Sequence, residues 1–157
     1  MKIVLVKGKS GSGKTSISRA ACFVCDRIRL TSVINPIKMM LYKVISKELS
    51  WKQRKALSIL YNEITNKESY WDELLEEDDD IVIIKTRVIS RQIHNWACSR
   101  ADEVVCVEVK RKGVIGDEDI TGNFTGYVEC ELINNDKGIL DGADELIKII
   151  LKKTNVK

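Results

Sequence analysis

A glycine-rich segment directly after a short apolar run is the feature that most constrains how this chain can fold. Residues 8–15 read Gly-Lys-Ser-Gly-Ser-Gly-Lys-Thr and match the phosphate-loop pattern G-x-x-x-x-G-K-[ST] at every fixed position. The preceding run, Ile3–Val6, is continuously apolar, as expected of a strand buried on both faces. Apolar residues then recur at helical spacing, at Ile17, Ala20, Ala21 and Val24. Strand, glycine loop and helix in this order favour a triphosphate-binding loop over a chance match.

In such a loop the backbone N–H groups surround the phosphates, and glycine leaves room for their approach. We expect the Lys14 ammonium to lie against the β- and γ-phosphates and the Thr15 hydroxyl to hold Mg²⁺. The pattern alone leaves open whether the chain is a switch, a motor, a nucleotide holder or a kinase. The residues expected to bind the nucleotide are Gly8, Lys9, Ser10, Gly11, Ser12, Gly13, Lys14 and Thr15.

Further strands alternate with amphipathic helical segments along the rest of the chain. The expected strands are Arg29–Ile34, Ile81–Ile84, Val104–Val109 and Val128–Ile133. This alternation predicts an α/β fold of the P-loop NTPase type, with a five-stranded, mainly parallel sheet flanked by helices on both faces. The 157 residues suit a single domain, with acceptor-binding helices above the sheet at about 35–80 and a short glycine-rich lid at about 110–127.

Basic residues follow two of the expected strands, at the sheet edge where parallel α/β folds bind ligands. Arg87 follows the third strand, where its guanidinium would clamp a second phosphate or pair with a nearby acid. Lys110, Arg111 and Lys112 follow the fourth strand. These cations would stabilise a transferring phosphoryl group from a closing lid, or form a solvated surface cluster.

Two more cations lie in the helical segment between the second and third strands. Lys38 follows Pro36 at the start of one expected helix, and Arg54 shares a helical side with Leu57 and Tyr61. Each would reach an acceptor molecule from above the sheet, or lie with its long stem over apolar surface.

Composition excludes several other functions. A net charge of +3 gives no support for nucleic-acid binding. No N-K-x-D motif is present, which argues against a GTPase switch, and the single histidine, His94, argues against a hydrolase with a histidine base. The chain shows no secretory signal or membrane span, so we expect a cytoplasmic protein with reduced thiols. Cys22 and Cys25 form a lone C-x-x-C pair, too few ligands for zinc, and are interpreted as small apolar residues.

Together these residues resemble nucleoside monophosphate kinases of the phosphate-loop class, most nearly the phage-type deoxynucleoside monophosphate kinases. The resemblance runs along nearly the whole chain but is specific in only a few places. Beyond the glycine loop, the matching segments are Ser32–Lys38, Arg54 with Leu57 and Leu60, Ile83–Arg87, Val107–Arg111, Glu129 and Ile133–Gly138.

The resemblance implies transfer of the γ-phosphate of ATP, with Mg²⁺, to a nucleoside or deoxynucleoside monophosphate, giving ADP and the diphosphate. It implies catalytic roles for Lys14, Arg87 and Arg111. It implies small nucleotides as partners, without nucleic acid or membrane, and leaves a homodimer open. The residues implied to bind the acceptor are Lys38, Arg54, Arg87, Gln92 and Lys110.

Two positions depart from the family pattern. Lys85, two residues before Arg87, stands where the family usually has an acid that helps to hold Mg²⁺ through water. Gln92 stands where a glutamate is common. The alternative hypothesis is therefore a catalytically weak or degenerate P-loop nucleotide-binding module with a regulatory or structural role.

Overall fold

The computed structural model describes residues 1–9, 11–33, 50, 52–53, 55–56, 59, 67–86, 88–111, 130–134 and 138–152. The strands are β1 (Lys2–Lys7), β2 (Ile28–Ser32), β3 (Ile81–Lys85), β4 (Glu103–Arg111) and β5 (Cys130–Asn134). The helices are α1 (Lys14–Val24), α4 (Glu68–Asp72), α5 (Arg91–Arg100) and α6 (Ile139–Leu151). The expected helices between residues 35 and 66 and the expected lid lie largely outside the described residues.

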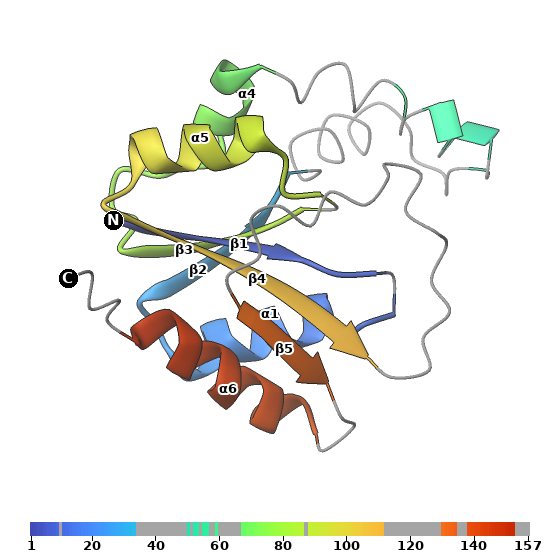
Figure 1. Ribbon diagram of the computed structural model, residues 1–157, viewed down its shortest axis with the longest axis vertical. Coiled ribbons are helices and arrows are strands. Elements are labelled where there is room, and N and C mark those ends of the chain that lie inside the picture. The colour runs from blue at the N-terminus through green and yellow to red at the C-terminus, as the bar shows by residue number, and fades with distance from the viewer. Residues whose placement is uncertain are drawn as a thin grey trace.

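The strands form one sheet in the order β2–β3–β1–β4–β5, and every neighbouring pair is parallel (Figure 1). β1 lies at its centre, where Val6 is paired with Lys85 of β3 on one side and with Val107 of β4 on the other. The predicted parallel α/β class is therefore confirmed. All strands end at the same edge, which brings the segments that follow β1, β3 and β4 together.

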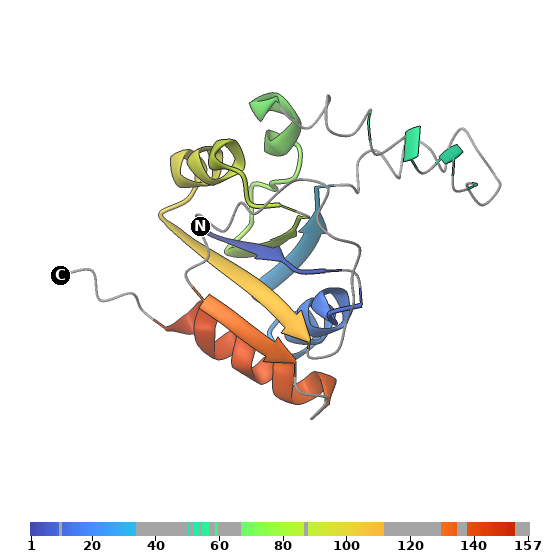
Figure 2. The same cartoon turned by 45° about the vertical axis from the view of Figure 1, so that its right-hand side comes forward.

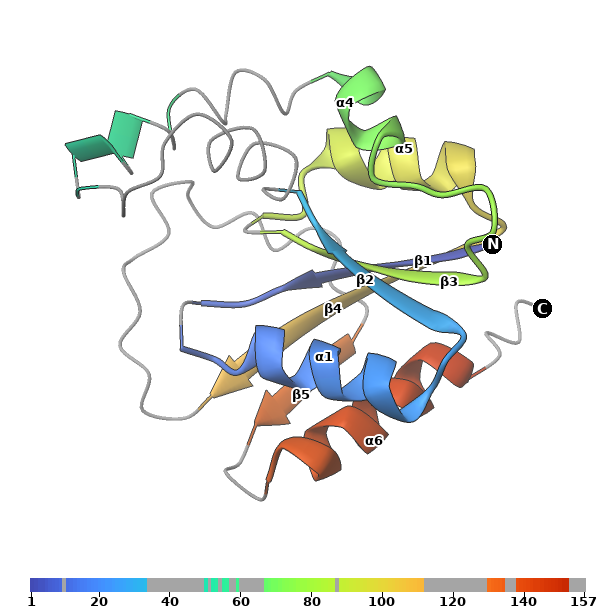
Figure 3. The same cartoon turned by 180° about the vertical axis from the view of Figure 1, so that it is seen from behind.

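Helices cover both faces of the sheet. Figure 3 shows α4 and α5 over one face and α1 and α6 over the other. In β1, Val4 and Val6 contribute to the core beneath α1 and α6, whereas Ile3 and Leu5 contribute to the core beneath α5. Because neighbouring residues of a strand point to opposite faces, a strand covered on both faces must be continuously apolar. Within the described ranges, every helix is too short or too polar to span a bilayer.

The second strand is shorter than its sequence suggests. Arg29–Ile34 was the expected range, but β2 ends at Ser32, which is paired with Lys85 at the end of β3. Val33 forms a turn, and its N–H donates to the Lys85 carbonyl at 3.0 Å. β2 therefore stops where its partner strand stops, which hydrophobic pattern alone cannot reveal.

Two contacts fix α6 against the rest of the domain. An ideal Cβ on Gly142 would lie 2.9 Å from Ile17 Cδ1, so glycine allows α6 to pack closely on α1. At the other end of α6, Lys2 Nζ donates to the Ile150 carbonyl at 2.6 Å and pairs with Glu103 at 2.7 Å. The C-terminal end of α6 therefore lies beside the start of β1 (Figure 2), at the edge opposite the strand ends.

A carboxylate joins α4 to α5. Asp72 accepts from Arg100 Nε and Nη2 at 2.8 and 3.0 Å and from Trp96 Nε1 at 2.8 Å. The Trp71 and Trp96 rings lie next to this pair, with their centroids 5.7 Å apart. The hydrogen bonds from Arg100, followed by that from Trp96, lower the pKa of Asp72 to about 2. The charged form of Asp72 is therefore favoured in the folded state.

We predict that Asp72→Asn lowers the free energy of unfolding by about 0.5 kcal/mol at pH 7, the scale of a partly exposed ion pair. Since the pKa of Asp72 is depressed by folding, its contribution is complete above the unfolded value near 3.9 and is lost as pH falls toward 2. The difference between wild type and variant should therefore shrink below about pH 4. Urea unfolding across this pH range measures it.

The matched control is Asp144→Asn, which removes an exposed carboxylate on α6. It should leave the free energy of unfolding nearly unchanged at every pH. A deficit in Asp72→Asn that does not change with pH would show that altered packing, rather than the lost charge, is responsible.

Candidate phosphate-binding site

The glycine loop connects β1 to α1, as the sequence predicts. Gly11 and Gly13 adopt φ values of 80° and 86°, in the left-handed region that glycine enters without strain. The Ser12 N–H donates to the Lys9 carbonyl at 3.1 Å, which closes the turn. Gly13 is the N-cap of α1, and its carbonyl accepts from Ile17 N at 2.9 Å. The first N–H groups of α1 have no partner within the helix and suit an anion.

Gly8 brings this loop directly against the end of β4. An ideal Cβ on Gly8 would lie 2.6 Å from the Val109 carbonyl oxygen and 2.7 Å from Ser12 Oγ. Because a backbone carbonyl cannot move aside cheaply, only glycine fits here. A cavity of about 210 Å³ lies at this junction, lined by Lys9, Ser12, Glu108, Val109, Lys110 and Arg111.

Lys14 is held across the loop. Its ammonium donates to the Gly8 carbonyl at 2.9 Å, although the two residues are six positions apart. The lysine is half-buried at the first position of α1. Its charge is therefore already at the glycine loop, where its predicted phosphate partners would lie.

Lys85 is the site residue to which the sequence assigned no role. Its ammonium donates to Thr15 Oγ1 at 3.0 Å, from the last residue of β3 to the second residue of α1. The backbone around Lys85 is held on both sides, since Val33 N–H donates to its carbonyl and Thr86 N–H donates to the Val6 carbonyl, each at 3.0 Å. The sequence shows only that a lysine stands at the end of a strand. The strand order, with β3 next to β1, is needed to place this lysine beside Thr15.

The donors around Thr15 do not suit a magnesium ion held by its hydroxyl. P-loop proteins hold Mg²⁺ between this hydroxyl and an acid at a neighbouring strand end, but here that strand ends in an ammonium. An ion bound to Thr15 Oγ1 would lie next to the Lys85 ammonium, and two positive charges this close repel each other. Thr15 as a metal ligand stays a prediction.

Acidic partners accompany the cations at the end of β4. Glu108 pairs with buried Lys7 at 3.8 Å and with exposed Lys110 at 3.7 Å. Arg111 ends the strand and is exposed. Lys110 and Arg111 therefore lie beside the glycine loop, as expected from the topology, and their roles toward a phosphate stay predictions. The described residues contain no group of three or more His, Cys, Asp or Glu side chains that could hold a metal.

The remaining predicted site residues are only partly described. Ser10, Lys38, Arg54 and Arg87 lie outside the described residues. Gln92 is the second residue of α5 and is exposed, on the helix that follows the end of β3. Its contact with an acceptor stays a prediction.

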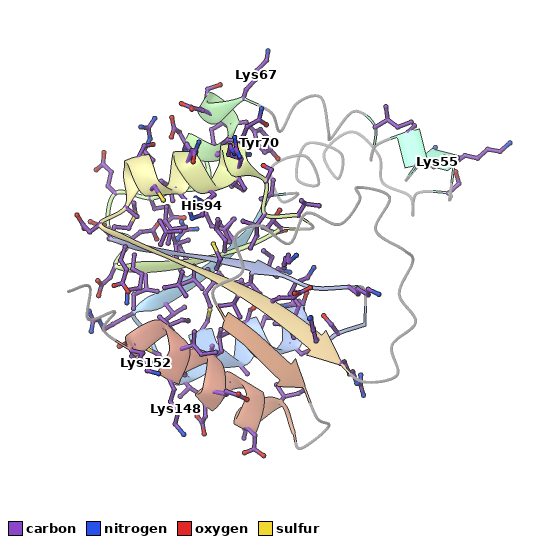
Figure 4. The ribbon with its side chains drawn as sticks, in the orientation of Figure 1. Lys55, Lys67, Tyr70, His94, Lys148 and Lys152 are labelled. Carbon is purple, nitrogen blue, oxygen red and sulfur yellow. The ribbon has the colours of Figure 1, made fainter. Side chains whose placement is uncertain are left out.

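His94 and Cys22, the histidine and one of the cysteines considered from the sequence, lie outside this site. His94 lies on α5 (Figure 4), with its ring nitrogens 3.9 Å from Cys98 Sγ one turn away. Cys22 lies toward the C-terminal end of α1, and burial, together with neighbouring Cys25, raises the pKa of its thiol. A raised thiol pKa fits the interpretation of Cys22 as a packing residue rather than a nucleophile.

Comparison with known proteins places the fold. Neither a protein-family model nor a curated protein sequence matches this chain. Among solved structures, a protein of Chloroflexus aurantiacus j-10-fl assigned as a kinase is similar with a TM-score of 0.59 and 10% identity, covering 96% of this chain and 98% of its own. The APS kinase CysC of Mycobacterium tuberculosis is similar with a TM-score of 0.53 and 16% identity, covering 94% and 95%. The chain thus has an α/β fold similar to that of P-loop kinases.

Proposed function

We propose that this protein is an ATP-dependent phosphotransferase that moves the γ-phosphate of ATP to a nucleoside or deoxynucleoside monophosphate, giving ADP and the diphosphate. The observation that carries the proposal is the set of cations at one edge of the sheet. Lys14 and Lys85 lie at the glycine loop, and Lys110 and Arg111 lie beside it at the end of β4. Because these cations come from three different strand ends, we propose that they contact two substrates, a triphosphate at the glycine loop and a second phosphorylated molecule beside it.

The chemistry of the site supports transfer rather than acid–base catalysis. Phosphoryl transfer depends on in-line positioning and on neutralising charge, and it needs little proton transfer by side chains. The one histidine of the chain, His94, lies on α5 and contacts Cys98 instead of the loop. The charged groups described at the loop are therefore mainly cations, with Glu108 paired to Lys7 and Lys110, and cations and backbone N–H groups bind and orient phosphates.

The monophosphate acceptor rests on the resemblance of the sequence to nucleoside monophosphate kinases. Lys38, Arg54, Arg87 and Gln92 are proposed to bind this acceptor. The name of one structural neighbour, an APS kinase, makes APS a further acceptor that a substrate screen should include. The proposed partners are small nucleotides in the cytoplasm, and a homodimer is left open.

We predict that Lys14→Ala lowers acceptor-dependent ADP formation by at least about 100-fold, because it removes the charge that faces the transferred phosphate. The assay measures ADP release with ATP and each common nucleoside or deoxynucleoside monophosphate, and with APS. The matched control is Lys148→Ala, which removes an exposed lysine in the last turn of α6 (Figure 4), at the edge of the sheet opposite the glycine loop. Lys148→Ala should retain the wild-type rate.

Two results of this assay would contradict the proposed function. Equal ADP release with and without acceptors would indicate a plain nucleoside triphosphatase. Tight ATP binding with no release for any acceptor would favour the degenerate nucleotide-binding module.

We also predict that Gly8→Ala weakens ATP binding by at least about tenfold and lowers the free energy of unfolding by about 1–3 kcal/mol. The new Cβ would meet the Val109 carbonyl at 2.6 Å, so the glycine loop would have to move away from β4. Calorimetric titration with ATP and urea unfolding measure the two effects.

Gly138→Ala is the control that separates the loss of stability from the loss of ATP affinity. Gly138 has a φ of 114°, which strains alanine, but no atom lies within 4 Å of the new Cβ. This control should lose stability while keeping wild-type affinity for ATP. Unchanged ATP affinity in Gly8→Ala would show that the loop does not need its close packing on β4 to bind phosphate.

A further inference from the structure

The contact between Lys85 and Thr15 sets an ammonium beside the hydroxyl that holds the metal ion in P-loop proteins. We infer that Lys85 is a built-in cation of the nucleotide site, binding phosphate oxygens beside Thr15 in place of the divalent ion, so that ATP binds without Mg²⁺. The inference rests on the proposed function only in taking a nucleoside triphosphate as the ligand.

The position of Lys85 is set by the sheet rather than by a flexible loop. Lys85 is the last residue of β3 and is paired with Val6 of β1 and with Ser32 of β2. Hydrogen bonds to the backbone on both sides hold it there. The glycine loop begins two residues after Val6, so a half-buried lysine at this place directs its long side chain to the start of α1.

The charges of the site are consistent with this role. In P-loop proteins generally, one lysine, one divalent ion and one acid face the phosphates, with two net positive charges. Here Lys14 donates to Gly8 and Lys85 donates to Thr15, so two ammonium groups supply two positive charges at the same loop. A triphosphate would therefore meet about the same positive charge without a metal ion as it meets in other P-loop proteins with one. A divalent ion at Thr15 would add further positive charge next to Lys85.

A purely structural role for Lys85 is the competing explanation. The bond to Thr15 Oγ1 would then serve to fix α1 on β3. However, α1 is already packed into the core through Ile17 and Ala21. A structural lysine would change the stability of the protein but would not make ATP affinity depend on the metal, and this difference decides the test.

The experiment measures the dissociation constant of ATP for the full chain by calorimetric titration, once in EDTA and once in excess MgCl₂. For the wild type, removing Mg²⁺ should weaken binding by less than about threefold, because no metal contact is lost. Lys85→Met should weaken binding in EDTA by at least about tenfold, through loss of a charge-assisted hydrogen bond. Lys85→Asp, which introduces the acid usual in P-loop proteins, should bind ATP well only with Mg²⁺.

The matched control is Lys148→Met, which changes the net charge of the protein by the same amount as Lys85→Met. Lys148 is exposed in the last turn of α6 (Figure 4), close to Ile150, whose carbonyl accepts from Lys2 at the start of β1. It therefore lies at the edge of the sheet opposite the glycine loop. This variant should match the wild type in both buffers, and circular dichroism and urea unfolding show that each variant is folded.

Wild-type binding that weakens more than about tenfold in EDTA would overturn the inference, as would Lys85→Met binding that equals the wild type in EDTA. ATP binding absent in both buffers would overturn both the inference and the proposed function. The two can also fail separately. Metal-independent binding without transfer to any acceptor defeats the proposed function alone, whereas acceptor-dependent transfer with strictly metal-dependent binding defeats the inference alone.

Discussion

The central constraint on this structure is the parallel pairing of β1 between β3 and β4. Five backbone positions of β1 are in register with β3, and six with β4, so the three strands run to the same edge, where β4 extends past Glu108, the partner of Lys7, to Arg111. This places the glycine loop, Lys85 and the cations at the end of β4 at one edge although they are far apart in sequence. The two apolar layers that cover the sheet stabilise this pairing, and the chemistry of the edge depends on it.

Electrostatics at that edge differ from the usual arrangement in one respect. A P-loop normally combines one lysine with a metal ion and an acid, whose charges partly cancel. Here a second ammonium lies against the threonine hydroxyl at the start of α1. A fixed ammonium is positioned by the fold itself, whereas a metal ion must be recruited from solution together with its nucleotide. The identity of one residue at a strand end thus decides how the site balances the charge of its ligand.

The hydrophobic pattern was sufficient to predict several strands and helices, but not where β2 ends or which side chains meet. Two strands, the one before the glycine loop and Ile81–Ile84, could be predicted because burial on both faces demands continuous apolar residues. The helix after the loop could be predicted from apolar residues at helical spacing. The end of β2 could not, since it is set by pairing with β3. The bond between Lys85 and Thr15 joins residues 70 positions apart, and only the strand order brings them together. Lys38, Arg54 and Arg87 lie outside the described residues, so their predicted roles are untested.

The packing of Gly8 on the Val109 carbonyl has a mechanical consequence. With no side chain between them, the glycine loop and the end of β4 meet backbone to backbone, and close-packed atoms transmit displacement with little loss. Lys110 and Arg111 follow Val109 directly in the chain. A displacement of the glycine loop would therefore be transmitted through Val109 to the strand end that carries these two cations.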